Sequence, residues 1–131
     1  GTISRMGLGY EDVKKINPNI IMMSVSIQGQ TGPYGKHPGY GVLASGITGL
    51  THITGWPDQG PASPGAYSDA TTPRFGGAIL LAALEWRRRT GRGQYIDLSQ
   101  LDFTYKITQC QVILEGKYDV FFYLDFKNLN K

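Results

Sequence analysis

The stretch PRFGGAILLAALEWRRRTGRGQYIDLS, residues 73–99, decides the fold, because it joins a helix pattern to a strand pattern through a short turn. Apolar residues at helical spacing predict a helix from about Pro73 to Arg89, opened by Thr72-Pro73 and ended by Gly91. From Gln94 to Ser99, apolar and polar residues alternate, which predicts a strand. The helix face expected to meet the core consists of Phe75, Ile79, Ala82, Ala83 and Trp86.

The same alternation of helix and strand extends in both directions. Tyr10–Ile16 is a short helix candidate, since the following Asn17-Pro18 disfavours helical geometry. Ile20–Ile27 is an apolar run expected to form a strand buried on both faces. Tyr40–Thr54 and Leu101–Leu114 have helix-like apolar spacing. The pattern predicts an α/β fold, in which a partial, Rossmann-like and mostly parallel sheet is flanked by helices.

Loops and an aromatic tail separate these elements. Glycine and proline crowd residues 28–40 and recur from Trp56 to Pro64, so both segments are expected to be loops. The aromatic segment Tyr118–Phe126 is expected to be a core or edge strand rather than a binding surface.

Composition bounds the location and the possible cofactors. A chain of 131 residues can bury a core without disulfides, and Cys110 has no second cysteine to pair with. His37 and His52 have no cysteine or acidic residue at metal-ligand spacing, so no metal site is expected. No export leader or apolar run of about 20 residues is present. We therefore expect a cytoplasmic protein that does not enter a membrane.

Asp69, in the run PGAYSDATTP at residues 64–73, places a carboxylate where a turn feeds the long helix. Taken alone, it has two interpretations. Asp, Ser and Thr are common helix caps, and residue type by itself favours that role. The N-terminal end of a helix also stabilises an ionised carboxylate, which would suit a nucleophile.

Two basic features have weaker functional interpretations. The loop Gly29–His37 superficially suggests a phosphate-binding loop, but it lacks the glycine and the Ser or Thr that such a loop needs. Lys36 and His37 could still meet an anionic ligand, or simply face water. The cluster of Arg87, Arg88, Arg89 and Arg92 admits a nucleic-acid binder as a minor alternative, yet aromatic residues are not interleaved with it. No nucleic-acid partner is expected.

Six short motifs in a fixed order resemble the middle of the class III CoA-transferases. That family includes formyl-CoA, carnitine and benzylsuccinate CoA-transferases and is related to α-methylacyl-CoA racemases. The resemblance implies that residues 1–102 are the central part of the family's large domain and that residues 103–131 are a divergent helix and aromatic tail. The motifs are Arg5-Met6-Gly7, Ile16-Asn17-Pro18, Gly29-Gln30-Thr31-Gly32-Pro33-Tyr34, Pro38-Gly39-Tyr40, Ala66-Tyr67-Ser68-Asp69 and Arg88-Arg89-Thr90-Gly91-Arg92-Gly93-Gln94.

The resemblance implies a reaction and its participants. Asp69 matches the family's nucleophile, which takes coenzyme A from an acyl-CoA thioester and passes it to a carboxylic acid through an aspartyl-CoA intermediate. A carboxylate is ionised at neutral pH and needs no general base for this attack. Coenzyme A thioesters are then substrates, and no permanently bound cofactor is expected. Full-length family members form homodimers.

Binding residues carry over by position. Arg5 matches an arginine that contacts the CoA phosphates, and Met6 beside it could pack on the adenine. Gly39, Tyr40 and Gly41 match the segment that lines the CoA site near the thioester. Pro38 stands where some relatives have lysine, so Lys36 could supply that charge.

Departures from the family leave alternatives open. Related racemases look as if they need histidine at the position of Tyr40, and tyrosine is a poor base at neutral pH, so transferase is preferred over a racemase-like fragment. By the resemblance, residues 1–131 are expected to correspond to neither the family's N-terminal CoA-binding segment nor its C-terminal part. We therefore expect residues 1–131 alone to be poorly active, and a non-catalytic remnant or interaction domain stays an alternative.

Overall fold

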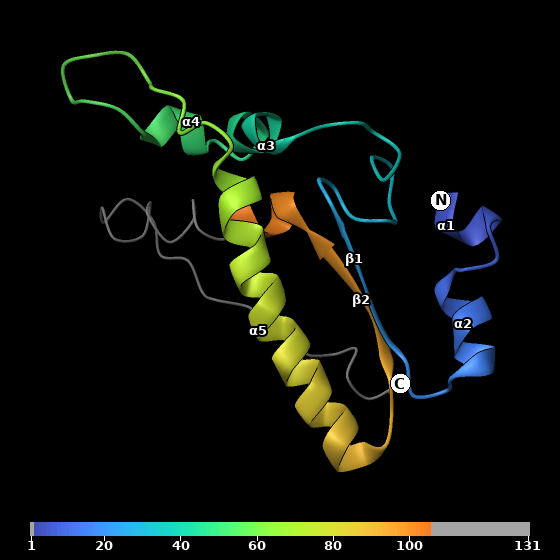
Figure 1. The fold of residues 1–131 in the computed structure, drawn as a ribbon. Helices are drawn as coiled ribbons and strands as arrows, with labels where there is room; N and C mark the ends of the chain where they lie inside the picture. The colour runs from blue at the N-terminus through green and yellow to red at the C-terminus, as the bar shows by residue number, and fades with distance from the viewer. Residues whose placement is uncertain (1, 106–131) are drawn as a thin grey trace.

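The computed structural model describes residues 2–105 and has the α/β architecture that the sequence predicts (Figure 1). Two strands, β1 (Ile21–Ser26) and β2 (Gln94–Ser99), pair in parallel with Ile21 opposite Gln94 and Ser26 opposite Ser99. The helices are α1 (Thr2–Arg5), α2 (Tyr10–Ile16), α3 (Gly41–Ile47), α4 (Leu50–Ile53) and α5 (Tyr67–Thr90).

Helices lie on both sides of this sheet. On one side α5 runs along the strands, where a Cβ built on Gly76 would lie 3.4 Å from Leu98 Cδ2 and 3.6 Å from Met23 Sδ. Helix α2 lies on the other side (Figure 1), where the centroid of the Tyr10 ring is 5.4 Å from that of the Tyr95 ring. Leu98 and Tyr95 are an odd number of positions apart, so they point to opposite faces of the strand.

The long helix starts earlier than predicted. Helix α5 begins at Tyr67, and Pro73 lies inside it instead of opening it. The apolar periodicity that predicts a helix begins only at Phe75. In the turns before it, the buried residues are Ser68 and Thr72, which are small and polar and lie one turn apart. The predicted end is confirmed, since Gly91 has a left-handed φ of 69° and its N–H bonds the carbonyl of Arg87 at 2.8 Å.

The prediction of which residues of α5 face the core is largely wrong. Of the residues predicted to form that face, Ala83 is buried and Ile79 is half-buried. Phe75 is 47% exposed, although the centroid of its ring lies 4.0 Å from that of Phe103. The buried line consists of small residues: Ser68, Thr72, Gly76 and Ala83. Small side chains allow the helix backbone to approach the sheet closely, so contact with two strands is made along a narrow stripe.

Burial of the first strand is also less than expected. Val25 is 50% exposed and the other residues of β1 are half-buried, because only one strand pairs with it in the described region and a loosely packed α2 covers its second face. The predicted helix from Tyr40 to Thr54 divides into α3 and α4 at Gly49, which has a φ of 78°.

Other predictions have mixed outcomes. Helix α2 has the predicted bounds, and residues 28–40 and 56–64 contain no helix or strand. Residues 100–105 are helical, whereas the rest of the helix predicted to Leu114 and the segment Tyr118–Phe126 lie outside the described residues. Within residues 2–105, no helix is both long enough and apolar enough to cross a membrane.

Candidate active site

Asp69 lies in the first turn of α5, but its side chain does not cap that helix. Instead, Oδ2 accepts the backbone N–H of Gly41 at 3.0 Å, and Oδ1 accepts the Nε2–H of Gln100 at 3.1 Å. The donors come from the start of α3 and from the residue after β2. The helix-cap interpretation is therefore wrong: tertiary contacts, not the local backbone, hold the carboxylate.

Glycine at position 41 is what allows this approach. A Cβ at Gly41 would lie 2.7 Å from Asp69 Cγ and 3.1 Å from Ser68 Oγ, and closer still to Asp69 Oδ2. Any side chain there would displace the carboxylate or push α3 away from α5. Helices α3 and α5 contact each other, and the hydrogen bond from Gly41 to Asp69 joins the start of one to the first turn of the other.

Gln100 connects the carboxylate to a buried hydroxyl. Its Oε1 accepts a hydrogen bond from Ser68 Oγ at 2.9 Å, while its Nε2 donates to Asp69. Ser68 is completely buried. The three side chains form a continuous network at the end of the sheet.

A cavity of about 380 Å³ opens at Asp69. Its walls come from the carboxyl end of β1 and from the loop that follows, including His37, Gly39 and Tyr40, with Gln100 completing the rim. The carboxyl ends of parallel strands are where ligands bind in open α/β sheets. The arrangement presents a carboxylate, with both oxygens oriented, to a ligand-sized space.

The loop over this cavity is tied to the sheet by a second aspartate. Asp97 Oδ2 accepts the backbone N–H of Gln30 at 2.8 Å, and a Cβ at Gly29 would lie 3.4 Å from the same oxygen. Gly29 has a φ of 80°, which favours glycine at this turn. Asp97 thus sets the direction in which the loop leaves β1.

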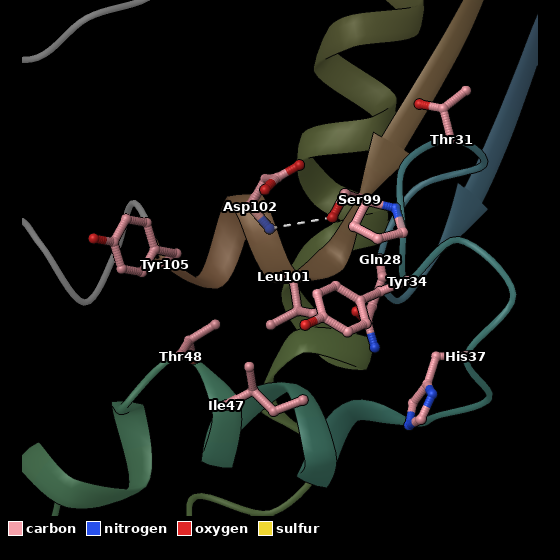
Figure 2. A pocket seen from close by; sticks show the side chains of 11 residues that line it. Gln28, Thr31, Tyr34, His37, Ile47, Thr48, Ser99, Leu101, Asp102 and Tyr105 are labelled. Carbon is pink, nitrogen blue, oxygen red and sulfur yellow. Dashed lines mark hydrogen bonds between the residues drawn. The ribbon is translucent and has the colours of Figure 1, made fainter.

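A second cavity, of about 530 Å³, lies beside the first and shares Gln28 and His37 with it. Figure 2 shows Tyr34, Ile47 and Leu101 among its walls, with Asp102 donating its backbone N–H to Ser99 Oγ at 3.2 Å. Asp69 does not line this space. Its walls combine apolar residues such as Ile47 and Leu101 with polar ones such as Gln28 and Asp102.

The structure brings together only part of the expected site. Gly39 and Tyr40 line the Asp69 cavity and Gly41 bonds the carboxylate. Lys36 and Pro38 are exposed and do not line it, although their neighbours Gly35, His37 and Gly39 do.

Arg5 and Met6 are also not among the residues that line the Asp69 cavity. The Arg5 guanidinium donates to Thr2 Oγ1 at 3.3 Å, and Met6 is 67% exposed. Their expected contacts with coenzyme A remain predictions.

Sequence reasoning assigned no separate role to Ser68 or Gln100. It named His37 only as a possible contact for an anionic ligand, and the structure places His37 at the walls of both cavities. A signal for Gln100 was present: it follows a predicted parallel strand directly, at the sheet edge where ligands bind. Ser68 gave no such signal, because a buried serine next to an aspartate resembles ordinary helix-start sequence.

Other candidate sites are weaker. Among residues 2–105, no group of three or more His, Cys, Asp or Glu side chains comes together to hold a metal ion. The arginine cluster is partly neutralised, since Glu85 accepts from Arg88 Nε at 2.7 Å and from Arg89 Nε at 2.6 Å. Arg88, as the larger cause, and Arg89 together lower the pKa of Glu85, and Glu85 in turn raises the pKa of Arg88.

The fold and the site define an α/β unit with a cavity and an acidic side chain at the carboxyl end of parallel strands. The family model described as CoA-transferase family III matches residues 1–118. The chain belongs to this family.

Relatives with assigned names agree with that membership. The chain is 47% identical over 102 residues to succinyl-CoA:glutarate CoA-transferase of Mus musculus, covering 77% of this chain and 23% of the relative. It is 38% identical over 120 residues to the beta subunit of succinyl-CoA–L-malate CoA-transferase of Chloroflexus aurantiacus, covering 90% and 30%. The chain therefore spans about a quarter to a third of the length of these relatives.

Solved structures agree on the fold. A crystal structure of a CaiB/BaiF family protein from Brucella suis superimposes with a TM-score of 0.80 at 34% identity. The match covers 91% of this chain and 32% of that protein.

Proposed function

We propose that this chain carries the nucleophilic segment of a class III CoA-transferase, with Asp69 as the group that reacts. The observation that carries the proposal is the Asp69 carboxylate itself, held by Gly41 and Gln100 at the mouth of a cavity at the sheet edge. Family membership supports the reaction type.

The proposed chemistry proceeds in two exchanges. An oxygen of Asp69 attacks the thioester carbon, the carbon–sulfur bond breaks, and the CoA thiolate leaves with the electron pair. The thiolate then attacks the aspartyl carbon of the resulting mixed anhydride, expelling the donor acid as a carboxylate and forming an aspartyl-CoA thioester. The acceptor acid reverses both steps. Each carboxylate oxygen accepts one hydrogen bond here and keeps a further lone pair for attack.

Substrates are proposed from the chemistry of the relatives. Their names pair succinyl-CoA with glutarate or L-malate, so a short dicarboxylic acyl-CoA donor and a carboxylic acid acceptor are the first choices. Arg5, Met6 and Lys36 are proposed to contact coenzyme A, and the assembly is proposed to be a homodimer in the cytoplasm. Tyr40, which lines the cavity, favours transfer over racemisation because a phenol is a poor base at neutral pH.

Intact-mass measurement after incubation with succinyl-CoA tests the proposal. A CoA adduct is expected on the parent chain and on Asp58→Asn, which changes an aspartate in the separate loop after α4. No adduct is expected on Asp69→Asn. An adduct that persists on Asp69→Asn would disprove the role of Asp69, and no adduct on any variant would leave the non-catalytic alternative.

A further inference from the structure

Gln100 contacts the proposed nucleophile but takes part in neither of the proposed bond exchanges. It is the first residue after β2, and its side chain reaches back to the first turn of α5, where it meets both Ser68 and Asp69. We propose that Gln100 is a positioning residue, which holds the Asp69 carboxylate in one orientation and is itself held by the buried hydroxyl of Ser68. The hydrogen bonds that hold Asp69 do not depend on what Asp69 does, whereas an effect of Gln100 on the reaction rate rests on the proposed function of Asp69.

The direction of the Gln100 amide follows from the donors and acceptors around it. An ionised carboxylate only accepts hydrogen bonds, so the amide must turn its NH₂ group toward Asp69. Its carbonyl oxygen then faces Ser68, whose hydroxyl can donate. The reversed amide would set two oxygen atoms against each other at Asp69. Asp69 therefore sets the orientation of the amide, and the Ser68 hydroxyl, which can donate, holds the carbonyl end in place.

Burial makes this arrangement specific. The Ser68 side chain is completely buried and its hydroxyl donates to Gln100, so removal of the Gln100 amide would leave that hydroxyl without its acceptor. Backbone and side chain thus fix the carboxylate from two directions, through Gly41 at Oδ2 and Gln100 at Oδ1. A carboxylate bound at both oxygens cannot rotate freely about its last bond. Such pre-orientation is how a weak nucleophile gains rate.

Gln100 can also serve the acylated state. A thioester on Asp69 retains one carbonyl oxygen, which still accepts hydrogen bonds, so the amide does not have to turn during the reaction. Its NH₂ group is a suitable donor both before and after the exchange. This distinguishes it from a hydroxyl or carboxyl group, which could switch to accepting.

The geometry is tested by NMR on the full 131-residue chain labelled with ¹⁵N. The side-chain amide protons of Gln100 are expected to be shifted from those of exposed Gln59, and to move in both Asp69→Asn and Ser68→Ala. The Gln59 signals serve as the internal control and should not move. Gln100 signals that coincide with those of Gln59 and stay unchanged in both variants would overturn the proposal.

The consequence for rate is tested with Gln100→Met, which keeps the length and shape of the side chain without its amide. At saturating succinyl-CoA, the rate constant for adduct formation should fall about tenfold to a hundredfold, while the half-saturating concentration of succinyl-CoA stays the same. Gln59→Met should match the parent chain. A Gln100→Met rate equal to that of the parent chain would overturn the positioning role.

The two measurements separate this inference from the proposed function. If the parent chain forms no adduct, the proposed function fails, and the NMR signals of Gln100 alone decide whether it holds Asp69. If the adduct forms and Gln100→Met changes neither rate nor signals, the positioning role fails while the function of Asp69 stands. Circular dichroism of Gln100→Met and Ser68→Ala establishes that both variants fold.

Discussion

The backbone N–H of Gly41 donates to the Asp69 carboxylate at 3.0 Å, and that carboxylate occupies the space where a side chain on residue 41 would begin. Two segments far apart in the chain thereby depend on each other. The start of α3 supplies the donor, and the first turn of α5 supplies the acceptor.

Gly41→Ala is expected to destabilise the fold by about 1–3 kcal/mol, because the new methyl group meets the Asp69 carboxylate. Gly46→Ala is the matched control in the same helix, where a Cβ meets nothing within 4 Å. That change should stabilise by up to about 1 kcal/mol through helix propensity. Urea unfolding of both variants measures the difference, and equal midpoints would contradict the close approach of Asp69 to Gly41.

Thr72→Val is expected to raise the free energy of unfolding by about 1–2 kcal/mol. The Thr72 hydroxyl is buried on the sheet side of α5 and has no hydrogen-bond partner among the residues described, so its desolvation is uncompensated. Thr71→Val is the control and should lower the free energy of unfolding, because Thr71 Oγ1 donates a hydrogen bond to the carbonyl of Tyr67 at 2.9 Å that valine cannot make. Thermal unfolding compares the two. A loss of stability in Thr72→Val would indicate that its hydroxyl is satisfied.

Gly93→Ala should destabilise by about 3 kcal/mol, at the upper end of the usual cost of overpacking. A Cβ at Gly93, just before β2, would overlap the carbonyl oxygen of Ile20 and lie 2.7 Å from that of Asn19, and backbone cannot move aside as a side chain can. Gly77→Ala in α5, where a Cβ meets nothing within 4 Å, is the control and should be neutral or stabilising. If both variants unfold at the same urea concentration, the chain before β1 does not pack against Gly93 as described.

Glu85 is expected to titrate below the ordinary range of glutamate, because Arg88 and Arg89 bond its carboxylate and lower its pKa. Since the folded-state pKa is lowered, the contribution of Glu85 to stability is present above the unfolded pKa and is lost as pH falls through the lowered value. The pair is exposed and screened by water, so this contribution is small. Carbon-detected NMR titration of the Glu85 carboxyl tests the direction. In Arg88→Gln the midpoint should rise toward the ordinary value, and an unchanged midpoint would contradict the assigned cause.

Local patterns were sufficient for several elements. Helix α2, strand β2 and the end of α5 at Gly91 follow from signals that act within a few residues: a following proline, strict alternation, and a left-handed glycine. The start of α5 could not be found in this way. Its first turns bury the small polar residues Ser68 and Thr72 against other segments, which leaves no apolar period to detect.

For the site as well, residues marked by local motifs could be predicted, whereas a residue that acts through a contact between distant segments could not. Asp69, Gly39, Tyr40 and Gly41 were singled out by the family resemblance. The structure places the first three at one cavity and bonds Gly41 to the Asp69 carboxylate. Gln100 was not singled out, because its importance comes from a contact that spans more than thirty positions of the chain. Arg5 and Met6 were singled out by motif as well, but they are not among the residues that line the cavity at Asp69.

The sequence by itself determined the fold class, the family resemblance and the identity of the candidate nucleophile, since periodicity and motif order are properties of the chain. Only the tertiary structure decided which groups hold that nucleophile. A carboxylate needs donors, and at Asp69 those donors come from α3 and from the end of β2, which become neighbours only when the parallel strands pair and α5 packs across them. Hydrogen bonds act over about 3 Å, so no pattern read along the chain can specify them until the fold brings their partners together.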